Sequence, residues 1–347
     1  MYFRTLATAV PSQSWSQAEC WQALKDTPAV RQLGHRARQL LEKVLLGNNG
    51  IERRHFAIQE VGGLPNLGAQ ELNEGYEREA VRLGEAALRS ALERAGLGRV
   101  DALFVSSCTG YLCPGLSSYL AQGLGLDSET YLADITGAGC GAAIPALRLA
   151  HGYLAAHPTH RAAVVAVEVS SAAFFLNEDP GVLISLCLFG DGAAALVLEG
   201  DEAAENSGRH PGWRFAHFSG LHWPEHREKV RFVNRLGKLC NQLHRSVPEL
   251  AARAVGVLYR QRDYSRHRVL CHAGGRDVLD AIERELGGVS LEEAREVLRC
   301  HGNMSSPSVL FALERAMKGG AHGQSYWLCA FGAGFAAHAC ALERLPA

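Results

Sequence analysis

Short apolar runs alternate with helical patterns along nearly the whole chain, and this alternation limits the possible folds more than any other feature. The runs have strand length and are apolar enough to be buried on both faces, and they include residues 102–107, 161–171, 192–200 and 267–275. Apolar residues at helical spacing fill other segments, such as residues 115–126, 142–157 and 276–286. Buried strands that alternate with helices predict an α/β fold in which helices cover a largely buried sheet.

Two segments share a pattern that indicates a duplicated core. Residues 188–200, LFGDGAAALVLEG, and residues 330–343, AFGAGFAAHACALE, each contain Phe-Gly-x-Gly followed by a small-residue strand that ends at an acidic residue. Each segment follows a strand–helix series of similar order. We expect the polar residues 201–214 to form the crossover between the halves, and residues 221–246 to form a long excursion that carries binding surface.

The composition excludes several function classes. The formal net charge of the 347 residues is −1, so the sequence lacks the basic excess of a nucleic-acid-binding protein and any electrostatic membrane patch. The 15 histidines are scattered and no Cys-x-x-Cys pair occurs, so we expect no metal site and no thioredoxin-like motif. The N-terminal residues do not resemble a secretory signal, and no apolar run reaches the ~18–20 residues that cross a bilayer. We therefore expect a cytoplasmic protein whose ten cysteines are free thiols.

One cysteine, Cys140, stands among glycines and alanines where a helical pattern begins. The backbone N–H groups at the start of a helix favour a thiolate, and small neighbours would let a substrate carbonyl come close, so Cys140 is a candidate nucleophile. A tightly packed strand-to-helix corner with an inert cysteine would have the same composition. The local pattern leaves both interpretations open, and a nucleophilic Cys140 needs a base.

Two residues near the ends of predicted elements are candidates to assist a nucleophile. His272 follows the apolar run of residues 267–271, and Asn303 lies between a glycine and a run of small residues that leads into a helix. A Cys/His pair supports nucleophilic acyl transfer, and an amide can stabilise an oxyanion. The alternatives are a buried structural histidine and an Asx turn or helix cap, and His301 is a rival histidine. Spacing alone does not show whether these residues meet.

Five segments resemble, in order and spacing, the landmark segments of type III polyketide synthases, the chalcone-synthase-like members of the thiolase superfamily. The most specific are GNMSSPSVLFALE (302–314) and LFGDGAAALVLEG (188–200). The others are HAGGRDVLDAIE (272–283), SSCTGYLCPGLSSYLAQGLGL (106–126) and GIERRHF (50–56). The resemblance runs from about residue 5 to 343.

The resemblance implies a layered αβαβα thiolase-like fold built from two duplicated halves. The first half would be residues 1–205, which carry the nucleophile, and the second residues 206–347, which carry the histidine and the asparagine. It further implies a homodimer, acyl-CoA and malonyl-CoA as substrates, and neither a metal nor a redox cofactor.

The same resemblance assigns roles to five residues. Cys140 falls on the acyl-accepting nucleophile, His272 on the histidine that keeps the thiolate charged and helps to stabilise the enolate, and Asn303 on its hydrogen-bonding partner. Phe189 falls on the aromatic residue beside the reacting thioester, and Cys108 on a non-catalytic cysteine near the active site of some bacterial members. The expected activity is decarboxylative condensation of malonyl-CoA onto an acyl starter held on Cys140, with cyclisation to a pyrone or phenolic product.

Several positions depart from the family pattern. The nucleophile is followed by GAAIPALR, the histidine motif reads HAGG rather than HPGG, and the C-terminal loop reads AFGAGF where GFGPG is usual. Asn241 stands at the position of an aromatic gatekeeper that contacts substrate, so the gate would be missing or supplied from elsewhere. The residues that hold the CoA phosphates have no signature, and the candidates by location are Arg38, Lys43, Arg53 and Arg54.

Two other functions are compatible with the sequence. The first is a β-ketoacyl-ACP synthase III-like enzyme that performs one condensation or acyl transfer with an acyl carrier protein as its partner, since that class shares the Cys-His-Asn set. The second is a non-catalytic partner that keeps the fold and stabilises an active homologue. The intact trio argues against the second alternative.

Overall fold

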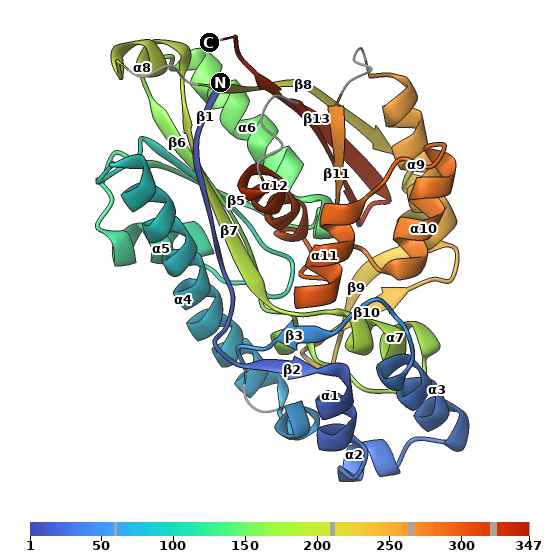
Figure 1. The fold of residues 1–347 in the computed structure, drawn as a ribbon. Coiled ribbons are helices and arrows are strands. Elements are labelled where there is room, and N and C mark those ends of the chain that lie inside the picture. Colours follow the sequence, from blue (N-terminus) through green and yellow to red (C-terminus); the bar gives the residue numbers. More distant parts are fainter. Residues whose placement is uncertain (59–60, 209–211, 263–266, 320–324, 347) are drawn as a thin grey trace.

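The computed structural model describes residues 1–58, 61–208, 212–262, 267–319 and 325–346 (Figure 1). Within these residues the largest sheet has nine strands in the order β11-β12-β13-β8-β1-β7-β6-β4-β5. Its N-terminal part consists of β5 (Tyr131–Ile135), β4 (Ala102–Ser106), β6 (Arg161–Glu168), β7 (Gly192–Glu199) and β1 (Tyr2–Ala9). Its C-terminal part consists of β8 (Trp213–His222), β13 (Ala336–Arg344), β12 (Ser325–Gly332) and β11 (His267–Cys271). The two parts join where Tyr2 of β1 pairs with Arg214 of β8.

The remaining elements surround this sheet. The helices are α1 (Gln17–Leu24), α2 (Pro28–Arg31), α3 (His35–Leu46), α4 (Ala69–Ala95), α5 (Leu116–Leu124), α6 (Ala143–Ala156), α7 (Pro180–Leu188), α8 (Asp201–Asn206), α9 (Val247–Arg260), α10 (Arg276–Glu285), α11 (Glu292–His301) and α12 (Ser308–Lys318). The short strands are β2 (Ser14–Ser16), β3 (Arg53–His55), β9 (Val230–Arg235) and β10 (Lys238–Leu243). The 3-10 turns are η1 (Val61–Asn66), η2 (Gly139–Gly141), η3 (Ser170–Ala173) and η4 (Pro224–Lys229).

Helices and sheet stack in layers. On one side, α4 packs against β1, β6 and β7. In the middle, α6 contacts β4 and β6 of the N-terminal part as well as β12 and β13 of the C-terminal part, and α12 contacts β1, β11 and β12. On the other side, α9 packs against β8, β12 and β13 and carries α10 (Figure 1). The order helix, sheet, helix, sheet, helix confirms the predicted thiolase-like α/β fold.

The central position of the sheet explains its composition. Every residue of β7 is buried, and so is every residue of β6 after Arg161. A strand covered by helices on both faces has no polar side, so it reads as a continuous apolar run. Small side chains such as those of Ala193, Ala194 and Ala195 allow α4 and the central helices to come close.

Most predicted strands and helices lie within a few residues of the observed ones, and the two segments between the halves have defined structure. The expected crossover at residues 201–214 contains α8 and the start of β8. The expected excursion at residues 221–246 contains the end of β8 and the hairpin of β9 and β10, which lies outside the main sheet and contacts α7. The division at residues 205 and 206 stays a prediction. Within the described residues, every helix is too short or too polar to cross a membrane.

Candidate active site

The predicted site residues lie where four elements begin or end. Cys140 is in η2, directly before α6, and His272 follows β11. Asn303 follows α11 and Phe189 follows α7. His272 and Asn303 are almost fully buried, and Cys140 is partly exposed.

The turn that carries Cys140 depends on glycines. Gly137 and Gly139 have φ values of +81° and +58°, which side chains rarely adopt. On the facing strand, a Cβ atom at Gly332 would lie 2.8 Å from the backbone nitrogen of Cys140. The residues around Cys140 therefore have small side chains because two backbone segments meet here. Pro145 is the third residue of α6, where a backbone N–H has no partner within the helix.

Ser305 connects the three candidate catalytic residues. Its side chain lies close enough to the Cys140 thiol to lower the pKa of that thiol, and its backbone lies close enough to the His272 ring to raise the pKa of the imidazole. Its N–H donates to Oδ1 of Asn303 at 2.8 Å. Ser305 holds φ at +59°, a strained value for a residue other than glycine. The structure thus brings Cys140, His272 and Asn303 together around one serine.

The Asn303 amide is fixed at both ends and keeps one free hydrogen. Nδ2 donates to the carbonyl of Gly274 at 3.1 Å, while Oδ1 accepts from Ser305. An amide nitrogen carries two hydrogens, so one remains for a substrate oxygen. The backbone of Asn303 forms an isolated parallel bridge with Phe189. The predicted shield and the predicted oxyanion donor are therefore neighbours.

The His272 imidazole is neutral in this environment. It is 1% exposed, and burial lowers its pKa to about 3, while the hydrogen bond to Ser305 offsets only part of that shift. Within the described part of the chain, Nδ1 has no hydrogen-bond partner. The ring of Phe331 meets the imidazole edge-on, with the ring centres 5.2 Å apart. The His272 ring is therefore positioned by the Phe331 ring and by the backbone of Ser305.

Burial and the local backbone have opposite effects on the Cys140 thiol. Burial raises the pKa of Cys140 to about 12, while the Ser305 side chain and the backbone N–H of Cys140 lower it in part. The backbone effect has the direction expected from the sequence, and burial is the larger cause. Without substrate, the neutral thiol and the neutral imidazole are the favoured forms.

A buried carboxylate, Glu168, lies beside the trio and was missed by the sequence analysis. It is 0% exposed and accepts hydrogen bonds from Oγ of Ser306 at 2.6 Å and from the N–H of Cys108 at 2.9 Å. It also accepts from the hydroxyl of Thr109 at 3.0 Å and from that of Ser305 at 3.3 Å. Burial raises the pKa of Glu168. The signal in the sequence was an acidic residue at the end of the apolar run of residues 161–171.

Cys108 belongs to the same cluster. Its thiol lies 3.4 Å from Oγ of Ser305 and 3.3 Å from Oε1 of Glu168. Burial, then the charge of Glu168 and then that of Cys140, raise the pKa of Cys108 well above its usual value. Cys108 therefore lies close to Cys140, as expected.

Asn241 lies on β10 and faces the same space as Phe189. Both line a narrow cavity of about 40 Å³, together with Ser170 and Phe232. Phe232 is the residue directly opposite Asn241 across the β9–β10 hairpin. An aromatic side chain beside Phe189 is thus supplied by the neighbouring strand.

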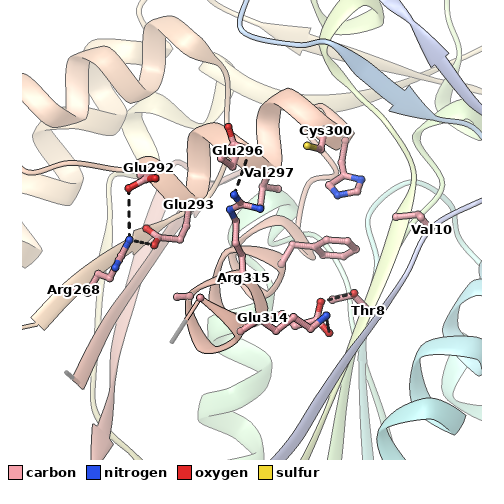
Figure 2. A pocket seen from close by; sticks show the side chains of 15 residues that line it. Thr8, Val10, Arg268, Glu292, Glu293, Glu296, Val297, Cys300, Glu314 and Arg315 are labelled. Carbon is pink, nitrogen blue, oxygen red and sulfur yellow. Dashed lines mark hydrogen bonds and ion pairs between the residues drawn. The ribbon is translucent and has the colours of Figure 1, made fainter. Parts of the chain in front are cut away.

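His301 is excluded as the histidine of the trio, and Arg54 is excluded as a residue that holds the CoA phosphates. His301 lines a separate pocket of about 560 Å³ between α11 and α12, which Figure 2 shows with its ion pairs, among them Arg315 with Glu296. Arg54 is 2% exposed, so it cannot contact a CoA phosphate at the surface. Arg38 and Lys43 lie exposed on α3, and Arg53 is bonded to Ser14 and Glu19.

Known proteins share this architecture and sequence. The family model described as FAE1/Type III polyketide synthase-like protein matches residues 16–217, and the C-terminal model of 3-oxoacyl-[acyl-carrier-protein] synthase III matches residues 264–344. The 3,5-dihydroxyphenylacetyl-CoA synthase of Amycolatopsis balhimycina is 32% identical over 339 residues, which cover 92% of this chain and 86% of that protein. The phloroglucinol synthase of Pseudomonas fluorescens is 27% identical over 313 residues, which cover 86% and 88%.

A solved structure of a bacterial type III polyketide synthase has the same fold. The crystal structure of 1,3,6,8-tetrahydroxynaphthalene synthase from Streptomyces coelicolor A3(2) aligns with a TM-score of 0.85 and 26% identity over 100% of both chains. These matches span both parts of the sheet and the segments that carry the site. The chain belongs to the type III polyketide synthase family and is a condensing enzyme of the acyltransferase class.

Proposed function

We propose that Cys140 holds an acyl starter as a thioester and that the enzyme extends it by decarboxylative condensation with malonyl-CoA. The observation that carries this proposal is the convergence of Cys140, His272 and Asn303 on Ser305.

Loading begins with proton transfer within the buried pair. Each charge alone is disfavoured by burial, which raises the pKa of Cys140 and lowers that of His272, so a thiolate forms only together with an imidazolium. The thiolate attacks the acyl-CoA carbonyl, the carbon–sulfur bond to CoA breaks, and the CoA thiolate leaves with the proton from His272. The product is acyl-Cys140 and free CoA.

Extension then uses the amide and the imidazole as donors. Cleavage of the bond to the carboxylate of malonyl-CoA releases carbon dioxide and leaves its electron pair in an enolate, whose oxygen lies within reach of Asn303 and His272. The enolate carbon attacks the thioester carbonyl of acyl-Cys140, and the Cys140 thiolate leaves. The result is a CoA thioester that is longer by two carbons.

We further propose a small polyhydroxylated aromatic product. Several relatives are named for 3,5-dihydroxyphenylacetyl-CoA, phloroglucinol or 1,3,6,8-tetrahydroxynaphthalene, and another is named for alpha-pyrone synthesis.

The test is incubation of the purified protein with malonyl-CoA and a series of acyl-CoA starters of increasing length. We expect release of CoA and carbon dioxide, a phenolic product, and an acyl mass on the Cys140 peptide. Cys140→Ala should abolish acylation and extension. Extension by Cys140→Ala would refute the assignment of the nucleophile, and no carbon dioxide with any starter would refute the function.

The same experiment distinguishes CoA thioesters from carrier-protein thioesters as substrates. The carrier-protein alternative is tested because the C-terminal family model is that of a 3-oxoacyl-[acyl-carrier-protein] synthase. Malonyl groups on an acyl carrier protein that outcompete malonyl-CoA at equal concentration would support the synthase III-like function. We expect the CoA thioesters to be the preferred substrates.

We also propose a cytoplasmic location, which would keep all ten cysteines as free thiols. We further propose that two copies associate along the edge of the sheet. In the described residues β5 is an edge strand that pairs only with β4. Two large apolar side chains lie beside this edge, Tyr131 at 52% and Leu149 at 51% exposed, around a hollow of about 670 Å³. An open edge next to exposed apolar surface is what a second copy would cover.

Light scattering after size-exclusion chromatography tests this association. We expect a dimer for the wild-type protein and for the control Leu46→Glu, whose leucine on α3 is 52% exposed. Leu149→Glu should give a monomer. A monomeric wild-type protein at micromolar concentration would contradict the proposal.

A further inference from the structure

A buried arginine, Arg54, has no role in the chemistry described above. It lies on β3, is 2% exposed, and forms no ion pair with any described carboxylate. Nε donates to Oε1 of Gln17 at 2.9 Å, and Nη1 donates to the carbonyls of Leu186 at 2.6 Å and Phe189 at 2.8 Å. The guanidinium charge is thus satisfied by neutral acceptors, in charge-assisted hydrogen bonds.

Two of these acceptors, the carbonyls of Leu186 and Phe189, belong to the C-terminal end of α7. The last four carbonyls of a helix have no partner within the helix, and together they form the negative end of its dipole. Arg54 binds two carbonyls at this end, and Nε2 of Gln17 donates to the carbonyl of Cys187 at 2.8 Å. The carbonyl between them, that of Leu188, accepts from the backbone N–H of Asn303 at 2.8 Å. The catalytic asparagine is therefore held by the helix end that Arg54 and Gln17 complete.

The contact between this helix end and Asn303 has little freedom. The N–H of Gly190 donates to the carbonyl of Asn303 at 3.0 Å. Gly302 has a φ of +69°, and a Cβ atom there would lie 2.7 Å from the carbonyl oxygen of Leu188 and 2.9 Å from Cγ of Arg54. The stem of Arg54 therefore packs directly against the backbone that leads into Asn303.

We propose that Arg54 is a positioning residue, which fixes Asn303 and Phe189 through the end of α7 and so sets the geometry of malonyl decarboxylation. This inference rests on the proposed function. Starter transfer depends on the Cys140 turn, which Arg54 does not contact, whereas enolate stabilisation depends on Asn303. Loss of the guanidinium fork should impair decarboxylation more than acylation.

The experiment compares Arg54→Lys with the control Arg99→Lys. Arg99 is exposed and forms an ion pair with Asp127 at the surface. A lysine ammonium cannot reproduce the planar fork that binds Gln17 and the helix carbonyls. We expect Arg54→Lys to lower carbon dioxide release by about 10²-fold, as misplacement of a catalytic group by ~1 Å does, while the rate of Cys140 acylation changes by less than about threefold. Arg99→Lys should leave both rates unchanged.

Two measurements keep the inference open to refutation. Unfolding midpoints report whether Arg54→Lys is folded. If it is not, Gln17→Leu replaces it as the test, because that change removes the acceptor of Arg54 Nε and the donor to the Cys187 carbonyl. Gln17→Leu should also lower carbon dioxide release more than Cys140 acylation, by a smaller factor. Equal loss of acylation and decarboxylation in a folded variant, or no loss of either, would overturn the inference. Absence of carbon dioxide release by the wild-type protein would instead refute the proposed function.

Discussion

At the scale of single residues, the reactivity of Cys140 is set by burial and by the charge of Glu168. Burial is the largest cause of the raised thiol pKa, and the charge of Glu168 adds to it. Glu168 itself is held by hydroxyl and backbone donors, without a cation among its hydrogen-bond partners in the described residues. A negative charge on Glu168 raises the pKa of the Cys140 thiol and so disfavours its thiolate.

Replacing Glu168 by glutamine should therefore lower the pKa of Cys140. Removing the negative charge favours the thiolate, and each unit of pKa corresponds to about tenfold more thiolate in the range below the pKa. The measurement is the pH dependence of iodoacetamide alkylation at the Cys140 peptide, followed by mass spectrometry. We expect the profile of Glu168→Gln to move to lower pH.

Glu199→Gln is the matched control for this change. Glu199 is a buried glutamate at the far end of β7, paired with Arg161 rather than with the site. Its alkylation profile should coincide with that of the wild-type protein. A profile of Glu168→Gln that stays in place, or moves to higher pH, would show that Glu168 does not act on the thiol through its charge.

At the scale of elements, the site depends on the close approach of β12 to the turn η2. A Cβ atom at Gly332 would lie 2.7 Å from the nitrogen of Gly141, 2.8 Å from the oxygen of Ala138 and 2.8 Å from the nitrogen of Cys140. These atoms are all backbone, so no side chain can move aside. The C-terminal strand thus forms one wall of the nucleophile turn.

Gly332→Ala should displace Cys140 and slow its acylation by at least tenfold, because the turn itself must shift to make room. The measurement is the rate of acyl transfer to Cys140 by intact-protein mass spectrometry. Gly98→Ala is the control, since nothing lies within 4 Å of a Cβ atom there. Normal acylation in Gly332→Ala would mean that the turn tolerates this movement.

The hairpin of β9 and β10 sets the size of the cavity beside Phe189. Phe232→Ala should enlarge the cavity that Phe232 and Asn241 share, and it should raise the relative rate with longer acyl starters. The measurement is the ratio of kcat/KM for a long and a short acyl-CoA, which cancels any loss of active protein. An unchanged ratio would place chain-length selection elsewhere.

The sequence predicted the elements better than the contacts among them. Apolar periodicity is a local property, so the strands at residues 102–107 and 192–200 were recognised from their own residues. Ser305 and Glu168 are separated by more than 130 positions, and only the fold brings their hydroxyl and carboxyl groups within 3.3 Å. The pKa of the Cys140 thiol could not be predicted for the same reason, because desolvation depends on neighbours that the local sequence does not include.

At the scale of the whole molecule, buried histidines couple stability to pH. Burial lowers the pKa of His272 to about 3 and those of His301 and His338 to about 4. In the unfolded chain these groups take up protons near pH 6.5, so between about pH 4 and 6.5 the unfolded state binds more protons than the folded state. Asp191 acts in the opposite direction, because burial raises its pKa to about 6 and the folded state holds its proton over part of the same range.

His55 and His151 also have lowered pKa values, and Glu168 has a raised one, so among the described residues five such histidines stand against two such carboxyl groups. The folded state should therefore lose stability as the pH falls from about 6.5 to 4. We expect the free energy of unfolding to decrease by on the order of 1–3 kcal/mol for each pH unit in this window, measured by urea denaturation. His301→Gln should reduce that slope by up to ~1.4 kcal/mol per pH unit, because one proton is no longer taken up on unfolding. His35→Gln, at an exposed position of α3, should leave the slope unchanged.

Since His301 lies outside the catalytic cluster, the pH at which activity is lost should stay the same in His301→Gln under conditions where both proteins are folded. A stability that is flat between pH 4 and 6.5 would mean that the folded state admits protons to these histidines without opening.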